Sequence, residues 1–191
     1  MIHGFLKACT VSPALRVADC AFNTQQTIAA MQRAAADGVQ LAVFPELGLT
    51  GYTCGDLFFQ QPLQRAAARG LAAVLEASAD LDLVALVGLP VTVDGKLYNC
   101  AAVVCHGKLL GLVPKTHLPN YGEFYEKRQF NPAPAGVRTL HFAGQEVLFG
   151  TKLLFRCAEM PEFCLGVEVC EDLWAPLPPS THHALAGATV I

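Results

Sequence analysis

The sequence predicts a mixed α/β layered fold, on two observations. In the first half of the chain, segments with apolar residues at helical spacing alternate with short, continuously apolar segments typical of buried strands. From residue 94 onward, short apolar runs follow one another across glycine-containing turns, a pattern typical of β-hairpins. The 191 residues suffice for one domain with a substantial core, and no repeat or linker divides them.

Two long helices are expected in the first half. Residues 19–36 place Ile28 and Met31 on one face, and Gly38 is free to take the left-handed conformation that ends a helix. Residues 62–77 repeat the helical pattern, with an apolar inner face that includes Leu71.

Short strands are expected along the rest of the chain, bounded by turn residues. The expected strands are residues 5–11, 41–44, 83–88, 100–105, 108–113, 137–142, 146–149, 153–157 and 163–169, the last running into Cys170. We also expect tight turns at Gly95 and Gly107, a third helix between Pro178 and Gly187, and a further strand from residue 188.

The chain stops within that last apolar run, so we expect residues 1–191 to be one unfinished domain of a longer polypeptide. Alone, these residues should be poorly soluble and inactive, because an unfinished sheet leaves an open edge.

Composition and charge exclude several classes of protein. With 53% hydrophobic and 15% charged residues the chain is not disordered, and so few charges indicate apolar surface covered by further chain or a partner. A net charge of −3 without a basic run predicts no nucleic-acid partner. The apolar runs are too short for a membrane span, so no membrane partner is expected.

The eight cysteines predict a reducing, cytoplasmic location rather than a disulfide scaffold. Several lie within apolar strand-like runs, where cysteine acts as a small hydrophobic residue. No C-x-x-C pair occurs, so a structural zinc site is not expected, and the pair His182 and His183 lacks the further ligands that another metal would need. The cysteines are Cys9, Cys20, Cys54, Cys100, Cys105, Cys157, Cys164 and Cys170.

Three places combine a reactive side chain with a strand end, where α/β folds build their sites. The first is Glu46, which follows the buried strand 41–44 and has apolar neighbours on both sides. Its carboxylate is poorly solvated, which favours proton uptake and suits a general base. A glutamate that only caps the strand end or forms an ion pair is the alternative.

The second place is Lys115, which lies directly after strand 108–113 between Pro114 and Pro119. A lysine on a backbone fixed in this way can present a point charge to an oxyanion that develops during a reaction. The alternative is a solvated surface lysine at a strand exit.

The third place is Cys170, which follows the last expected strand and precedes two acids, Glu171 and Asp172. Cys170 is therefore expected at a sharp turn from a strand into a helix, called the elbow below. A nucleophile at such a turn is exposed and has free backbone N–H groups beside it. The alternatives are a buried structural cysteine and a Cys–His pair, for which His117 is the candidate partner.

Together these places resemble the nitrilase superfamily of carbon–nitrogen hydrolases, whose members carry a Glu, a Lys and a Cys in this chain order. The motifs are F-P-E-L-x-L-x-G-Y at residues 44–52, P-K-x-x-L-P at 114–119 and V-C-E-D at 169–172. The segment L-P-x-Y-x-E-F-Y-E-x-R at 118–128 and the region after Cys170 further resemble the long bacterial form of glutamine-dependent NAD synthetases. The resemblance covers essentially the whole chain and implies a nitrilase-type α-β-β-α sandwich, incomplete at the C-terminus.

The resemblance also implies a role for each matching residue. Cys170 would be the nucleophile that attacks a glutamine carboxamide, Glu46 the general base and acid, and Lys115 the group that stabilises the oxyanion. The backbone N–H of Glu171 would assist Lys115, and Glu123, eight residues after Lys115, would position substrate and water. The residues implied to line the glutamine pocket are Tyr52, Tyr121, Phe124 and Glu171.

In the synthetase family this domain, which corresponds to residues 1–191 here, releases ammonia from glutamine. The ammonia passes to an ATP-dependent domain that amidates deamido-NAD to NAD. The resemblance therefore implies glutamine as a partner of this domain, with no cofactor bound in it. It implies ATP, Mg²⁺ and deamido-NAD as ligands of a synthetase domain outside these residues, and a homo-oligomeric assembly.

Two other functions stay open. A stand-alone amidase of the same superfamily would act on another amide, a carbamoyl compound or a nitrile, and residues 121–128 argue against it. A non-catalytic interaction module would keep the fold for assembly alone, and the presence of Glu46, Lys115 and Cys170 together argues against that.

Overall fold

The computed structural model describes residues 4–191, which form helices and strands in nearly the predicted order. The α-helices are α1 (Cys20–Ala36), α2 (Gln61–Ala77) and α3 (Pro179–Leu185), and the 3-10 helices are η1 (Gly55–Phe59), η2 (Glu126–Arg128) and η3 (Cys170–Trp174). The strands are β1 (Ala8–Thr10), β2 (Leu41–Val43), β3 (Val84–Val93), β4 (Lys96–Cys105), β5 (Lys108–Pro114), β6 (Arg138–Phe142), β7 (Gln145–Phe149), β8 (Leu154–Arg156) and β9 (Cys164–Gly166).

Seven strands form the main sheet, in the order β1-β2-β3-β4-β5-β7-β6, and β8 pairs with β9 in a second sheet. The first three strands run parallel, as expected for strands separated by helices. Tight turns then join β3, β4 and β5 as antiparallel neighbours, which confirms the hairpins predicted at Gly95 and Gly107.

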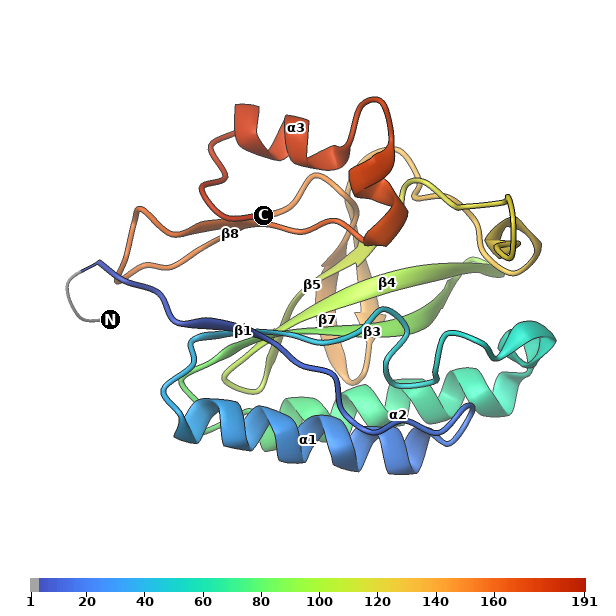
Figure 1. Ribbon diagram of the computed structural model, residues 1–191, viewed down its shortest axis with the longest axis horizontal. Coiled ribbons are helices and arrows are strands. Elements are labelled where there is room, and N and C mark those ends of the chain that lie inside the picture. Colours follow the sequence, from blue (N-terminus) through green and yellow to red (C-terminus); the bar gives the residue numbers. More distant parts are fainter. Residues whose placement is uncertain (1–3) are drawn as a thin grey trace.

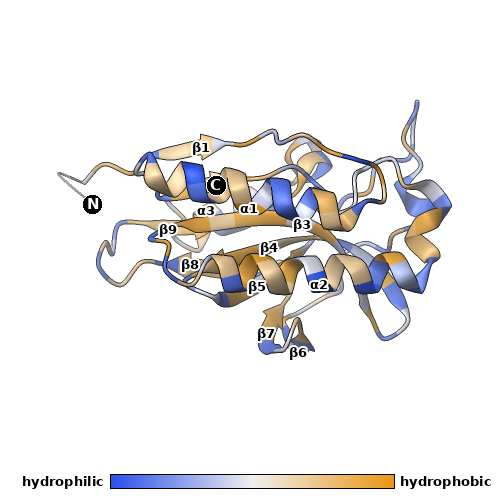
Figure 2. Cartoon of the chain, turned by 90° about the horizontal axis from the view of Figure 1, so that it is seen from below, coloured by the Kyte–Doolittle hydropathy of each residue, from blue (hydrophilic) through white to orange (hydrophobic). Residues whose placement is uncertain are grey.

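The elements stack in layers: the α1–α2 pair, the seven-stranded sheet, the β8–β9 sheet and α3 (Figure 1). Side chains alternate between the faces of a strand, so Ala85 and Val87 of β3 belong to the core beneath the helices. Leu86, between them, belongs to the core shared with Leu165 of β9. Seen from the helix side, α1 and α2 lie side by side across hydrophobic strands (Figure 2).

The two long helices are confirmed to within one residue at either end. Asp19 caps α1, because its carboxylate accepts a hydrogen bond of 3.0 Å from the N–H of Phe22. Gly38 follows the helix with a φ of 72°, as expected. Within residues 4–191 no helix is both long and apolar enough to cross a membrane.

The strand expected at 83–88 is longer than predicted and continues through Pro90 to Val93. Pro90 lies beyond Leu86, the last residue of β3 that pairs with β2. A proline without an N–H is tolerated there because this part of β3 pairs in the sheet with β4 alone.

The last two strand predictions were wrong in extent. β9 ends at Gly166, and the backbone turns into η3 at Cys170. The carboxylate of Asp172 accepts the N–H of Val169 at 3.0 Å, which removes that donor from strand pairing. The strand expected from residue 188 is a single bridge between Leu165 and Val190.

Gly88 of β3 determines how closely the loop after β2 can approach the sheet. A Cβ atom at Gly88 would collide with the backbone nitrogen of Leu47 and the carbonyl oxygen of Pro45. The Leu49 N–H donates to the Gly88 carbonyl at 3.1 Å. The loop that carries Glu46 therefore rests directly on the bare backbone of β3.

We expect Gly88→Ala to lower the free energy of unfolding by about 1–3 kcal/mol, since the added methyl meets backbone atoms that cannot rotate away. Gly111→Ala, in β5, is the control, because the nearest atoms its methyl would meet belong to the side chains of Phe155 and Leu153. Urea unfolding followed by circular dichroism measures both. Equal losses of unfolding free energy in the two variants would contradict the inference that the Glu46 loop rests directly on the backbone of β3.

Candidate active site

Three segments of the fold bring Glu46, Lys115 and Cys170 together. Glu46 lies in the loop after β2, Lys115 follows β5 directly, and Cys170 is the first residue of η3. The Lys115 Nζ atom lies 2.6 Å from Glu46 Oε1. The charges of both groups act on the Cys170 thiol. Residues separated by more than half the chain therefore share one site.

Lys115 is an interior ammonium, with 0% of its side chain exposed. Its Nζ donates to Glu46 at 2.6 Å and to Glu126 at 2.7 Å. Burial lowers the pKa of Lys115, but the two carboxylates outweigh burial and raise the pKa above its ordinary value. The group is thus charged at neutral pH, and the alternative interpretation, a solvated surface lysine, is wrong. An ammonium has three N–H donors, so one remains for a ligand.

Asn99 is a second donor to the same oxygen of Glu46. Its Nδ2 donates to Glu46 Oε1 at 2.7 Å, from a buried position within β4. Asn99 was not among the residues predicted for the site. The signal was available, because an amide inside an apolar strand needs a hydrogen-bond partner.

The second carboxylate on Lys115 belongs to Glu126, which the sequence analysis did not single out. Glu126 is 4% exposed, and the Tyr52 hydroxyl donates to its Oε1 at 2.7 Å. Burial, followed by this hydrogen bond, raises the pKa of Tyr52, so the hydroxyl keeps its proton. Glu123 is exposed and, within the range 4–191, forms no ion pair or side-chain hydrogen bond. Spacing along the chain could not tell these two glutamates apart, because the loop geometry decides which one reaches Lys115.

Cys170 has an unusual backbone and an unusual thiol. Its φ is 48°, a left-handed conformation that costs a non-glycine residue about 1–2 kcal/mol. It is the one exposed cysteine in the described part of the chain, which argues against a buried structural role. Partial burial of the thiol raises its pKa to about 11; the Glu46 charge adds to this and the Lys115 charge opposes it. At neutral pH the thiol is protonated and needs a base, and Glu46 is the adjacent carboxylate.

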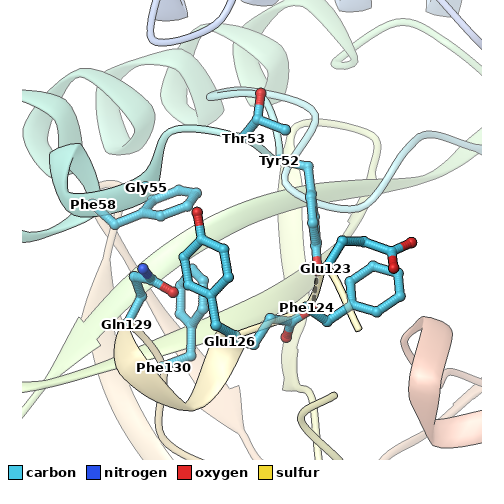
Figure 3. A pocket seen from close by; sticks show the side chains of 10 residues that line it. Tyr52, Thr53, Gly55, Phe58, Glu123, Phe124, Glu126, Gln129 and Phe130 are labelled. Carbon is cyan, nitrogen blue, oxygen red and sulfur yellow. Dashed lines mark hydrogen bonds between the residues drawn. The ribbon is translucent and has the colours of Figure 1, made fainter. Parts of the chain in front are cut away.

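A cavity of about 330 Å³ adjoins Glu126 (Figure 3). Half of its lining residues are aromatic, and the lining consists of Tyr52, Thr53, Gly55, Phe58, Glu123, Phe124, Tyr125, Glu126, Gln129 and Phe130.

The four predicted pocket residues form a chain of contacts between Glu126 and the neighbour of Cys170. Tyr52 and Phe124 meet edge to face at 6.3 Å, and Phe124 meets Tyr121 at 5.9 Å. The Tyr121 hydroxyl then donates to the Glu171 carboxylate at 2.9 Å.

Comparison with known proteins identifies the family. Residues 7–191 match the family described as Carbon-nitrogen hydrolase. The chain belongs to the carbon–nitrogen hydrolase family. This carbon–nitrogen hydrolase chain is 42% identical over 189 residues to a protein of Mycobacterium tuberculosis named glutamine-dependent NAD(+) synthetase. It is 34% identical over 163 residues to the protein of that name from Thermotoga maritima.

These alignments cover most of this carbon–nitrogen hydrolase chain but little of the relatives. They span 99% and 85% of the chain, against 28% and 25% of the two relatives. The chain therefore spans about a quarter of the length of these curated proteins.

Solved structures confirm the nitrilase-type fold. A glutamine-dependent NAD(+) synthetase from Cytophaga hutchinsonii superposes with a TM-score of 0.83 at 27% identity, over 97% of this chain and 30% of that one. An amidase from Nesterenkonia superposes with a TM-score of 0.67 at 22% identity, over 97% and 63% respectively, and shares the fold alone.

Removing the buried cation should destabilise the domain. We expect Lys115→Met to cost on the order of 3–5 kcal/mol of unfolding free energy, because two neighbouring carboxylates lose their counter-charge. Lys108→Met is the control at the exposed start of β5, the strand that precedes Lys115, and should change the free energy by less than about 0.5 kcal/mol. Urea unfolding at neutral pH measures both, and a small effect of Lys115→Met would show that the ion pairs do not stabilise the fold.

Glu46→Gln should lower the pH at which Cys170 reacts. The Glu46 charge raises the thiol pKa, so its loss should move the alkylation midpoint from about 11 toward the ordinary 9.0. At any pH below these midpoints the variant then alkylates faster than the wild type. Iodoacetamide labelling of the Cys170 peptide, quantified by mass spectrometry across pH, measures the midpoint. Labelling of the half-buried Cys157 is the internal control; a midpoint at or above the wild-type value would refute the assignment.

Proposed function

We propose that this domain hydrolyses glutamine to glutamate and ammonia through a thioester on Cys170. One observation carries the proposal: the interior ammonium of Lys115 is held by Glu46 and Glu126, and acts on the thiol of Cys170. A neutral nucleophile, an adjacent base and a fixed positive charge are the groups that acyl transfer from an amide needs.

In the proposed reaction, the Cys170 thiol transfers its proton to Glu46 as Sγ attacks the carboxamide carbon. The oxyanion that forms accepts the remaining N–H of Lys115 and the backbone N–H of Glu171. Glu46 then gives the proton to the departing nitrogen, ammonia leaves and the thioester remains. A water molecule, deprotonated by Glu46, attacks the thioester and releases glutamate and the thiol.

The remaining residues take supporting roles in this proposal. Glu126, together with Glu46, keeps Lys115 charged and in place. Tyr52, Tyr121, Phe124 and Glu171 bind the substrate, where the Glu171 carboxylate offers a charge complementary to the α-ammonium of glutamine. Glu123 lines the cavity beside Glu126. Its role in positioning substrate and water stays a prediction.

The ammonia would be used by a further domain of the same polypeptide, which amidates deamido-NAD to NAD with ATP and Mg²⁺. The names of the relatives support this assignment over a stand-alone amidase. A cytoplasmic homo-oligomer is the corresponding proposal for location and assembly.

The test is glutamate release from glutamine by the product of the complete reading frame, with and without ATP and deamido-NAD. We expect Cys170→Ala to lower release by on the order of 10³-fold or more, since no other group replaces the nucleophile. Cys157→Ser, at a half-buried cysteine, should retain wild-type release.

Release that needs Cys170 and rises with ATP and deamido-NAD supports the complete proposal. Release that needs Cys170 but ignores those substrates would point to a free-standing amidase. A folded protein that releases no glutamate would exclude glutamine as the substrate.

A further inference from the structure

The structure assigns a positioning role to Asp172: its buried carboxylate fixes the elbow that carries Cys170 to the loop that follows Lys115. This inference rests on the proposed function, because it takes the mutual position of these two residues to matter for catalysis.

The Asp172 carboxylate joins a segment that follows β5 of the main sheet to a segment that follows β9 of the second sheet. Its Oδ1 accepts the N–H of Thr116 at 3.0 Å and the N–H of His117 at 2.7 Å, just beyond the end of β5. Its Oδ2 accepts the N–H of Val169 at 3.0 Å, one residue before Cys170. Asp172 thus bonds backbone on the Lys115 side with one oxygen and backbone on the Cys170 side with the other.

The position of this carboxylate costs free energy that only its contacts can offset. Asp172 is 1% exposed, and burial raises the pKa of its carboxyl although the three N–H donors oppose that. A buried carboxylate is retained only where hydrogen bonds replace its hydration. Here all three donors are backbone groups of the segments flanking the proposed catalytic residues.

The backbone at the elbow also needs an external restraint. Cys170 is held in the left-handed region at a φ of 48°, which a free elbow would relax from. The other side of the Lys115 backbone is fixed separately, since its N–H donates to the Asn99 carbonyl at 2.8 Å. Lys115 is therefore tied to the main sheet, and Asp172 is a buried side chain that fixes the Cys170 elbow to the residues just after Lys115.

The test is Asp172→Asn in the product of the complete reading frame. The amide keeps the shape of the carboxylate, but one of its two ends becomes a donor facing an N–H donor. We expect kcat for glutamine hydrolysis to fall about 10- to 100-fold with KM changed less than about threefold, because misplacement of the nucleophile by a fraction of an ångström acts mainly on the chemical step.

The second readout is the pH dependence of Cys170 alkylation by iodoacetamide. A released elbow exposes the thiol and moves it away from Glu46, so the midpoint should fall from about 11 toward 9.0. A role in stability alone would lower the folded fraction and leave the midpoint of the folded protein unchanged. A fall in kcat with an unchanged midpoint would therefore overturn the inference, as would an unchanged kcat.

The matched control is Ser78→Ala, which removes another buried side chain that accepts a backbone N–H from a different segment. Ser78 is 1% exposed and accepts the N–H of Gly107 at 3.0 Å, at the β4–β5 turn and away from Lys115. It should lower the thermal unfolding midpoint while kcat and the alkylation midpoint stay at wild-type values.

If Asp172→Asn does not fold, Asp172→Glu is the variant that tests the inference. It keeps the charge, but the extra methylene must displace the elbow from the loop at 116–117, so kcat and the alkylation midpoint should both fall. A folded Asp172→Glu protein with wild-type values of both would overturn the inference. Should the wild type release no glutamate while Asp172→Asn still shifts the alkylation midpoint, the proposed substrate fails and the positioning of Cys170 stands.

Discussion

The interior ammonium of Lys115 is the constraint on which the rest of the site depends. A charged group without solvent exposure is stable only beside opposite charge, and Glu46, in the loop after β2, and Glu126, at the start of η2, supply it. One cation therefore fixes two carboxylates. One of them, Glu126, accepts a hydrogen bond from the hydroxyl of Tyr52, an aromatic residue that lines the cavity. Because two of its three N–H donors are occupied, the direction of the third is fixed as well.

The scaffold holds this cluster by backbone contacts rather than by bulky packing. The loop with Glu46 lies on Gly88, whose missing side chain lets two backbones touch. The Lys115 backbone bonds to β4, and Asp172 bonds the Cys170 elbow to residues just after Lys115. Backbone contacts of this kind allow little relaxation, which suits a site where a proton must pass between fixed atoms. The raised pKa of Cys170 fits the same arrangement, since a neutral thiol is activated only when its base is in place.

Most of the fold was predictable from the sequence, and the failures have local causes. Helix periodicity located α1 and α2, because each buries one apolar stripe against the sheet. The hairpins at Gly95 and Gly107 followed from their turn residues. The end of β9 was not predictable, because the side chain of Asp172 competes for a backbone donor that strand pairing would otherwise use.

Of the site, the sequence by itself determined that Glu46, Lys115 and Cys170 follow apolar segments in the order of a known family, and so which chemistry to expect. Only the tertiary structure decided that Glu126 rather than Glu123 contacts Lys115, that Asn99 holds Glu46, and that Asp172 connects the Cys170 elbow to the residues after Lys115. The physical reason is that sequence patterns report burial and local turns. Hydrogen bonds to a buried charge depend on which atoms of distant segments meet within about 3 Å.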